Sequence, residues 1–126
     1  SWSLELGWDD EYEGLFAFVD IEGKPSERLE WDMKLWWPHT EALYATLLAY
    51  RMTNDHQYWT WFEKIHSYAF ARFPDTDHGE WFGYLHRDGS IANSLKGSMW
   101  KGMFHVPRAL LNIRSLLREM YGEELT

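Results

Sequence analysis

The chain of 126 residues contains no cysteine, only four prolines and no long apolar run. Without cysteine there is no disulfide framework and no thiolate chemistry, which indicates a reducing compartment. No run of about 18 apolar residues is present that could form a transmembrane helix. The first residues also do not have the pattern of a signal peptide. Together these absences predict a soluble, cytoplasmic protein without a membrane partner.

Basic residues are scarce as well. The sequence has 12 Lys and Arg against 20 Asp and Glu, which gives a formal net charge of −8. This charge would repel a polyanion, and no basic stripe is present, so we expect no nucleic-acid partner. The spaced histidines and paired cysteines of metal sites are absent, and so we expect no metal. A glycine-rich phosphate loop and a G-x-S-x-G nucleophile motif are also missing.

Aromatic residues, in contrast, are abundant: the chain holds nine Trp, seven Tyr and seven Phe. The length and the 45% hydrophobic content fit one globular domain. Composition alone favours a core built from large aromatic side chains, because each of them buries a large area. Aromatic faces can also pack against the C–H faces of sugar rings. A carbohydrate pocket is therefore the alternative explanation of the aromatic excess.

Residues of matching type recur at one spacing along the chain. His39 and His105 are 66 residues apart (105 − 39), and so are Phe18 and Tyr84. A fixed period is the mark of a repeat architecture. Each unit is expected to contain a hairpin, a crossing loop and two helices, with the second unit ending after its first helix. Two such units leave apolar edges uncovered, which predicts either a piece of a larger ring or solenoid or assembly with other copies. A closed ring of six units would need about 400 residues.

Local patterns predict where the elements lie. Apolar residues recur at helical spacing, Pro38 and Pro107 suit first helical turns, and Asp55 can cap a helix. Asp88-Gly89 is typical of a hairpin turn. The helix after Asp55 carries aromatic residues over a wide arc, so it is expected to be mostly buried. The predicted elements are helices near residues 1–7, 38–52, 55–73 and 106–121, a strand at 15–19 and a hairpin at 80–95.

One motif places a histidine at a helix start. In Lys96-Gly-Ser-Met-Trp-Lys-Gly-Met-Phe-His-Val-Pro-Arg108, His105 comes just before the predicted helix. An imidazole in this position can project into a cleft, and histidine is the side chain that exchanges protons near neutral pH. Lys101 and Arg108 could hold oxygen atoms of a polar ligand. Alternatively, His105 is a surface or capping residue beside two solvated cations.

A second motif, Lys34-Leu-Trp-Trp-Pro-His-Thr-Glu41, precedes another predicted helix. Glu41 is expected in the first turn, where the positive end of the helix dipole favours a carboxylate. Two adjacent tryptophans cannot point the same way, so one of Trp36 and Trp37 can belong to the core while the other lines a pocket. Alternatively, Glu41 only completes a helix cap and the tryptophan packs in the core.

These two motifs, together with Glu80-Trp-Phe-Gly-Tyr84, resemble the C-terminal third of the N-acylglucosamine 2-epimerases, also known as renin-binding proteins. The resemblance covers essentially the whole chain. It implies an all-α fold in which residues 1–126 form the C-terminal portion of a single (α/α)6-barrel domain, with helical hairpins and short β-hairpins in the connecting loops. It also implies interconversion of N-acetylglucosamine and N-acetylmannosamine, by removal of the C2 proton and its return on the opposite face.

The resemblance further implies roles for individual residues. His105 corresponds to one of two catalytic histidines, and Glu41 to a carboxylate that assists catalysis or orients a histidine. The residues expected to line the substrate pocket are Trp37, Trp100, Lys101 and Arg108. The second histidine would lie in an N-terminal part outside this chain, so the isolated chain is expected to be inactive. The chemistry requires no cofactor, although some members are activated by ATP, and homodimers are common.

Two alternatives remain open at this point. A single base on one face of the sugar favours transfer of the proton to C1, which would make the protein an aldose–ketose isomerase of the mannose type on the same barrel. The other alternative is a helical module that binds carbohydrate or protein through its aromatic surface without catalysis.

Overall fold

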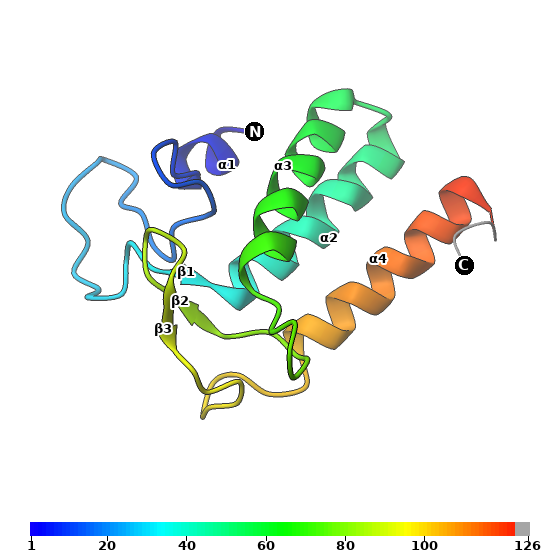
Figure 1. The fold of residues 1–126 in the computed structure, drawn as a ribbon. Helices are drawn as coiled ribbons and strands as arrows, with labels where there is room; N and C mark the ends of the chain where they lie inside the picture. The colour runs from blue at the N-terminus through cyan, green and yellow to red at the C-terminus, as the bar shows by residue number, and fades with distance from the viewer. Residues whose placement is uncertain (123–126) are drawn as a thin grey trace.

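The computed structural model describes residues 1–122 and shows three long helices with a small sheet at one end (Figure 1). In chain order the elements are α1 (Trp2–Gly7), β1 (Lys34–Leu35), α2 (Trp36–Thr53), α3 (His56–Arg72), β2 (Tyr84–Leu85), β3 (Ile91–Asn93) and α4 (His105–Tyr121). The long helices occupy the ranges that the apolar periodicity predicts. The fold is therefore mostly helical, as expected.

The helix starts explain where the candidate residues lie. α2 begins at Trp36 and not at Pro38. Pro38 is tolerated in the first turn, because the N–H that proline lacks would have no partner inside the helix anyway. The first turn of α2 holds no acidic residue, so the expectation that Glu41 sits there is wrong. The predicted cap of α3 is confirmed, since the Asp55 side chain accepts a hydrogen bond from the Gln57 N–H at 3.0 Å. α4 begins at His105 itself.

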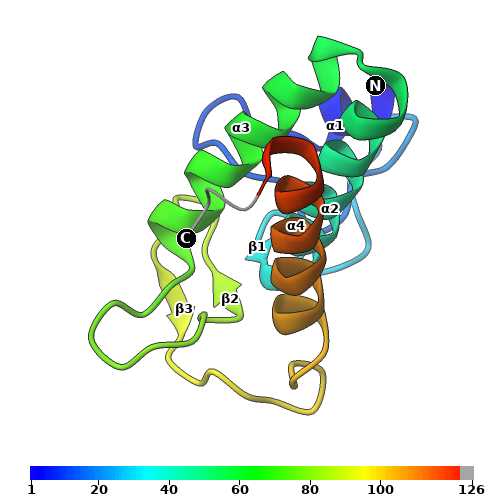
Figure 2. The ribbon, with the colours of Figure 1, turned by 90° about the vertical axis from the view of Figure 1, so that its right-hand side faces the viewer.

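The core lies between the long helices. α2 packs against both α3 and α4 (Figure 2). The side chains that meet there are apolar and buried, among them Leu43, Leu47, Ile65, Ala69, Ala109 and Ile113. The expectation that α3 is mostly buried is wrong: Phe70, for example, is 42% exposed. The aromatic residues of α3 are distributed around the helix, and the described residues cover the face towards α2 and the side that Trp8 contacts through Trp61 and Tyr68.

The sheet is antiparallel with the order β1-β2-β3. Its β2–β3 hairpin confirms the predicted turn, in which Gly89 has a φ of 84° that suits glycine. The pairing of β1 with β2 was not predicted; it places Lys34 opposite Leu85. The predicted strand at 15–19 is not a regular strand. Leu15 forms a single bridge, and the Ala17 and Phe18 N–H groups donate to the Met33 and Trp31 carbonyls in the loop that leads to β1.

The spacing of 66 residues reappears in the backbone. The two isolated bridges, and the turn that each of them encloses, are related by this spacing. The matched pairs are the bridges Trp8–Leu15 and Pro74–Trp81 and the hydrogen bonds from the Asp9 N–H to the Gly14 carbonyl and from the Asp75 N–H to the Glu80 carbonyl. In both turns the aspartate Oδ1 accepts hydrogen bonds from the amides two and three residues further on. The chain therefore contains two copies of one supersecondary unit, as the sequence predicts.

Candidate active site

A hollow of about 720 Å³ lies where α2 and α4 begin, beside the sheet. Most of its lining is aromatic or apolar, and the exceptions are Arg28, Glu30 and the imidazole of His105. The lining residues are Phe18, Arg28, Glu30, Met33, Leu35, Trp36, Trp37, Tyr84, Trp100 and His105. A concave aromatic site with a few polar groups is the usual form of a small-molecule site. The hollow is therefore the candidate active site.

The orientation of the His105 ring is fixed by the carboxylate of Glu41. Its Nδ1 lies 2.7 Å from Oε1 of Glu41, and Nη2 of Arg108 binds the same oxygen. The structure thus brings together three residues that the sequence singles out. A carboxylate can only accept, so the proton of this contact resides on Nδ1 and Nε2 is left to exchange protons. The arrangement suits a general base whose orientation is fixed by a partner.

The adjacent tryptophans differ in burial, although both line the hollow. Trp36 is buried at 2% exposure and packs edge-on against Tyr84, with ring centroids 5.3 Å apart. Trp37 is half-buried, and its ring centroid lies 6.1 Å from that of His105. Trp100 also borders the hollow and is 76% exposed. The rings of Trp37 and Trp100 are therefore available to a ligand beside His105.

Lys101, which we expected to bind substrate, does not line the hollow. Its side chain is buried, and its Nζ donates to Oε2 of Glu80 at 2.5 Å and to the Lys96 carbonyl at 2.8 Å. A Cβ on Gly83 would come within 2.8 Å of the Lys101 Cδ, so the lysine stem packs against bare backbone. A buried ammonium requires such a carboxylate partner. The expectation is corrected accordingly: Lys101 anchors the segment that leads to His105.

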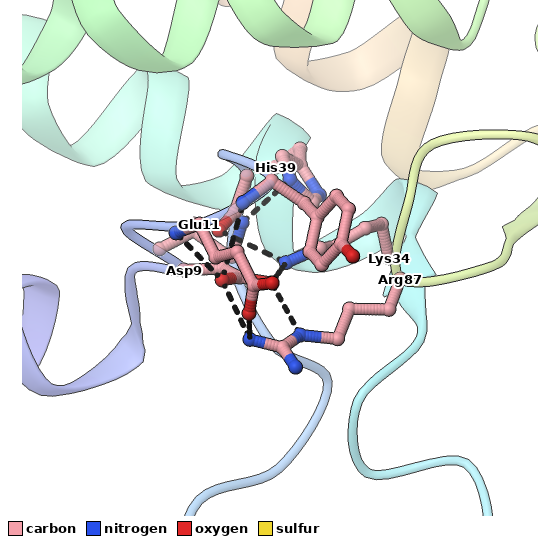
Figure 3. A network of polar contacts seen from close by, with 8 residues as sticks. Asp9, Glu11, Lys34, His39 and Arg87 are labelled. Carbon is pink, nitrogen blue, oxygen red and sulfur yellow. Dashed lines mark hydrogen bonds and ion pairs between the residues drawn. The ribbon is translucent and has the colours of Figure 1, made fainter.

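The other motif begins with a second buried lysine, Lys34, whose partners were not predicted from the sequence (Figure 3). Lys34 is 0% exposed, and its Nζ lies 2.8 Å from Oδ2 of Asp9. Arg87 also binds Asp9, through Nε at 2.8 Å and Nη2 at 3.0 Å. Burial favours the neutral acid, but the hydrogen bonds from Arg87 and Lys34 outweigh it and hold the pKa of Asp9 well below its ordinary value. Burial lowers the pKa of Lys34, and its hydrogen bond to Asp9 opposes this shift.

His39 lies beside this network and has no nitrogen free for chemistry. Its Nε2 accepts a hydrogen bond from the Leu15 N–H at 2.9 Å, and its Nδ1 donates to the Leu35 carbonyl at 2.6 Å (Figure 3). Burial lowers the pKa of His39 to about 4, so the ring is neutral at pH 7. His39 therefore bridges two backbone segments, whereas its repeat counterpart His105 borders the hollow.

Acidification is expected to destabilise the protein through His39. Its pKa is about 4 in the folded state, below the ordinary value of 6.5, so the unfolded chain binds the proton more readily. Stability is therefore lost as the pH falls from 6.5 towards 4, by about 3 kcal/mol in total. Urea unfolding at pH 7.0, 5.5 and 4.5 measures this loss. His39→Gln should be less stable at pH 7 and should lose less on acidification. An equal pH dependence in this variant would contradict the assignment.

Within residues 1–122, no group of three or more His, Cys, Asp or Glu side chains is placed to hold a metal ion. None of the helices in the same range combines the length and the apolar character needed to cross a membrane.

Solved structures of sugar epimerases and isomerases share the fold of this chain. The crystal structure of D-mannose isomerase matches with a TM-score of 0.79 and 20% identity over 89% of this chain and 28% of that chain. The cellobiose 2-epimerase from Spirochaeta thermophila matches with a TM-score of 0.71 and 25% identity over 85% of this chain and 26% of that chain. The fold is thus a portion of the (α/α)6 barrel of sugar epimerases and isomerases, which confirms the predicted fold class.

Residues 2–109 match the N-acylglucosamine 2-epimerase (GlcNAc 2-epimerase) family, and the chain belongs to this family. The N-acylglucosamine 2-epimerase of Bos taurus is 48% identical over 114 residues, which are 90% of this chain and 27% of the relative. That of Homo sapiens is 45% identical over 120 residues, which are 95% of this chain and 27% of the relative. The chain therefore spans about a quarter of the length of these relatives. The predicted family is confirmed.

Proposed function

We propose that the chain supplies one side of the active site of a sugar 2-epimerase that interconverts N-acetylglucosamine and N-acetylmannosamine. The observation that carries the proposal is the contact between Glu41 and the Nδ1 of His105 at the edge of an aromatic hollow. Support also comes from relatives at 45 to 48% identity that are N-acylglucosamine 2-epimerases.

In this mechanism His105 removes or returns the C2 proton of the ring-opened sugar through Nε2. The imidazolium that forms is stabilised by the Glu41 carboxylate, whose Oε1 is also bound by Arg108. Trp37 and Trp100 pack against the C–H faces of the sugar. The residues of this chain thus provide a base, a partner that orients the base, and an aromatic surface that positions the C2 carbon of the sugar next to the base.

Inversion at C2 requires a proton donor and acceptor on each face of the sugar. His105 serves one face, and the second base is proposed to come from a part of the protein outside this chain. The isolated chain is then inactive. A homodimer, a cytoplasmic location, and activation by a nucleotide such as ATP without a cofactor in the chemistry are further proposals that rest on the family resemblance.

Solvent exchange tests the reaction. The full-length protein containing this chain is incubated with N-acetylmannosamine in D2O, and the product is analysed by NMR. N-acetylglucosamine with deuterium at C2 is the expected product, because a proton removed by His105 equilibrates with solvent. The isolated 126-residue chain, as the control, should give no exchange. A ketose product would support the aldose–ketose isomerase instead, and binding without any exchange would support a carbohydrate-binding module.

A further inference from the structure

The hollow has two charged side chains on the wall that the mechanism above does not use. Arg28 and Glu30 both line it, and both come from the loop that leads into β1. The rest of that wall is apolar, with Phe18 and Met33 beside them. Charged groups that face an aromatic hollow are the kind of polar group that orients a ligand and determines specificity.

The backbone that carries these two residues is fixed by turns. The Trp31 N–H donates to the Arg28 carbonyl at 3.2 Å, and the Met33 N–H donates to the Glu30 carbonyl at the same distance. The Phe18 N–H in turn donates to the Trp31 carbonyl at 3.1 Å, which ties the loop to its neighbour. The Arg28 guanidinium also lies over the Phe18 ring, 5.7 Å from its centroid. The loop therefore presents both side chains from a defined position.

Neither of the two charged side chains is neutralised by an ion pair within the described part of the chain. Arg87, Arg108 and Lys101 each bind a carboxylate, whereas Arg28 and Glu30 make no ion pair with any residue in the range 1–122. A guanidinium can only donate hydrogen bonds, and an ionised carboxylate can only accept them. The pair thus offers one donor group and one acceptor group, two residues apart on the same loop.

We infer that Arg28 and Glu30 form the subsite for the N-acyl group of the sugar. Arg28 donates to the acyl carbonyl oxygen, and Glu30 accepts the amide N–H. This inference rests on the proposed function and deepens it. An N-acyl group presents one acceptor and one donor on neighbouring atoms, which matches the pair. The hydroxyl of a neutral hexose places one polar atom where the N-acyl group has two, so it satisfies fewer hydrogen bonds of the pair, and the pair selects amino sugars over hexoses such as mannose.

Substrate kinetics of the full-length protein test the subsite. Arg28→Met and Glu30→Ala should each raise the KM for N-acetylmannosamine by about 10- to 100-fold, which is the value of a hydrogen bond to a charged group. The kcat should change little, because the acyl group is bound equally in the ground state and the transition state. Inhibition by D-mannose, which lacks the acyl group, should stay within about twofold. Arg51→Met, in the last turn of α2, is the matched control and should behave as the wild type.

The possible outcomes separate the two proposals. If the wild-type protein does not epimerise N-acetylmannosamine, the proposed function fails, and the subsite fails with it. If the wild type is active and both variants keep the wild-type KM, only the subsite is overturned. A parallel loss of N-acetylmannosamine and mannose binding would also overturn it, because the loop would then act on the whole hollow. Melting temperatures equal to the wild type establish that the variants are folded.

Discussion

Replacement of His105 by glutamine is expected to lower the kcat of epimerisation by about 10³- to 10⁴-fold, the upper part of the range for a general acid–base. Glutamine keeps a similar shape and a hydrogen-bonding group near Glu41, but it cannot take up a proton. The binding of sugar should change little, since the aromatic walls of the hollow remain. Initial rates of the full-length protein with N-acetylmannosamine measure both effects, through kcat and KM.

The control for this variant is His78→Gln, because the His78 side chain is 80% exposed and does not line the hollow. Its activity should equal that of the wild type. A His105→Gln protein that is folded and retains about a tenth of the wild-type kcat would contradict the role of His105, since a general base is expected to contribute at least about 10²-fold.

Glu41→Gln should have a smaller effect than the change at His105. The amide still offers an oxygen to the Nδ1–H but no longer stabilises the imidazolium by its charge. A hydrogen bond to a charged group is worth about 1.5 to 3 kcal/mol, which corresponds to a kcat lowered by about 10- to 100-fold. Because Glu41 acts through His105, the double variant should be no worse than His105→Gln alone. A further loss in the double variant would show that Glu41 has an independent role.

The sequence predicted the features that depend on neighbours along the chain. The apolar spacing located α2, α3 and α4, the Asp88-Gly89 pair located the hairpin, and the 66-residue period identified the repeat. Short motifs also brought Glu41 and His105 to attention, and the structure places them in contact. Each of these signals lies within one element or one repeat unit, where propensity and periodicity are informative.

The sequence did not predict the features that depend on distant partners. β1 has only two residues and no alternation to reveal it. Lysine is almost never fully buried unless it is paired, and the partner of Lys34 lies 25 residues away in a turn. The same reasoning explains the error at Lys101, whose cationic character suggested a ligand contact although Glu80 neutralises it inside the protein. In both cases a lysine that lies shortly before a long helix is buried against a carboxylate from a distant turn.

The largest effect on stability is expected at Asp9. Its carboxylate joins three segments of the chain, since it binds Lys34 of β1 and Arg87 of the β2–β3 turn. Asp9→Asn keeps the shape but removes the charge, which leaves the fully buried Lys34 ammonium without compensation. Breaking one partner of a buried ion pair costs about 3 to 5 kcal/mol in the free energy of unfolding. Urea unfolding at pH 7 measures the loss, with the exposed neighbour variant Asp10→Asn as the control.

A double-mutant cycle decides whether the ion pair is the cause. Lys34→Met should cost less than Asp9→Asn, because Arg87 still holds the Asp9 carboxylate. Adding Lys34→Met to Asp9→Asn should recover about 1 kcal/mol or more, because no uncompensated charge then remains buried. Strictly additive losses would contradict this explanation. β1 leads directly into Trp36, so loss of the Asp9–Lys34 ion pair also loosens the start of α2. We therefore expect Asp9→Asn to weaken sugar binding at the hollow as well as to destabilise the fold.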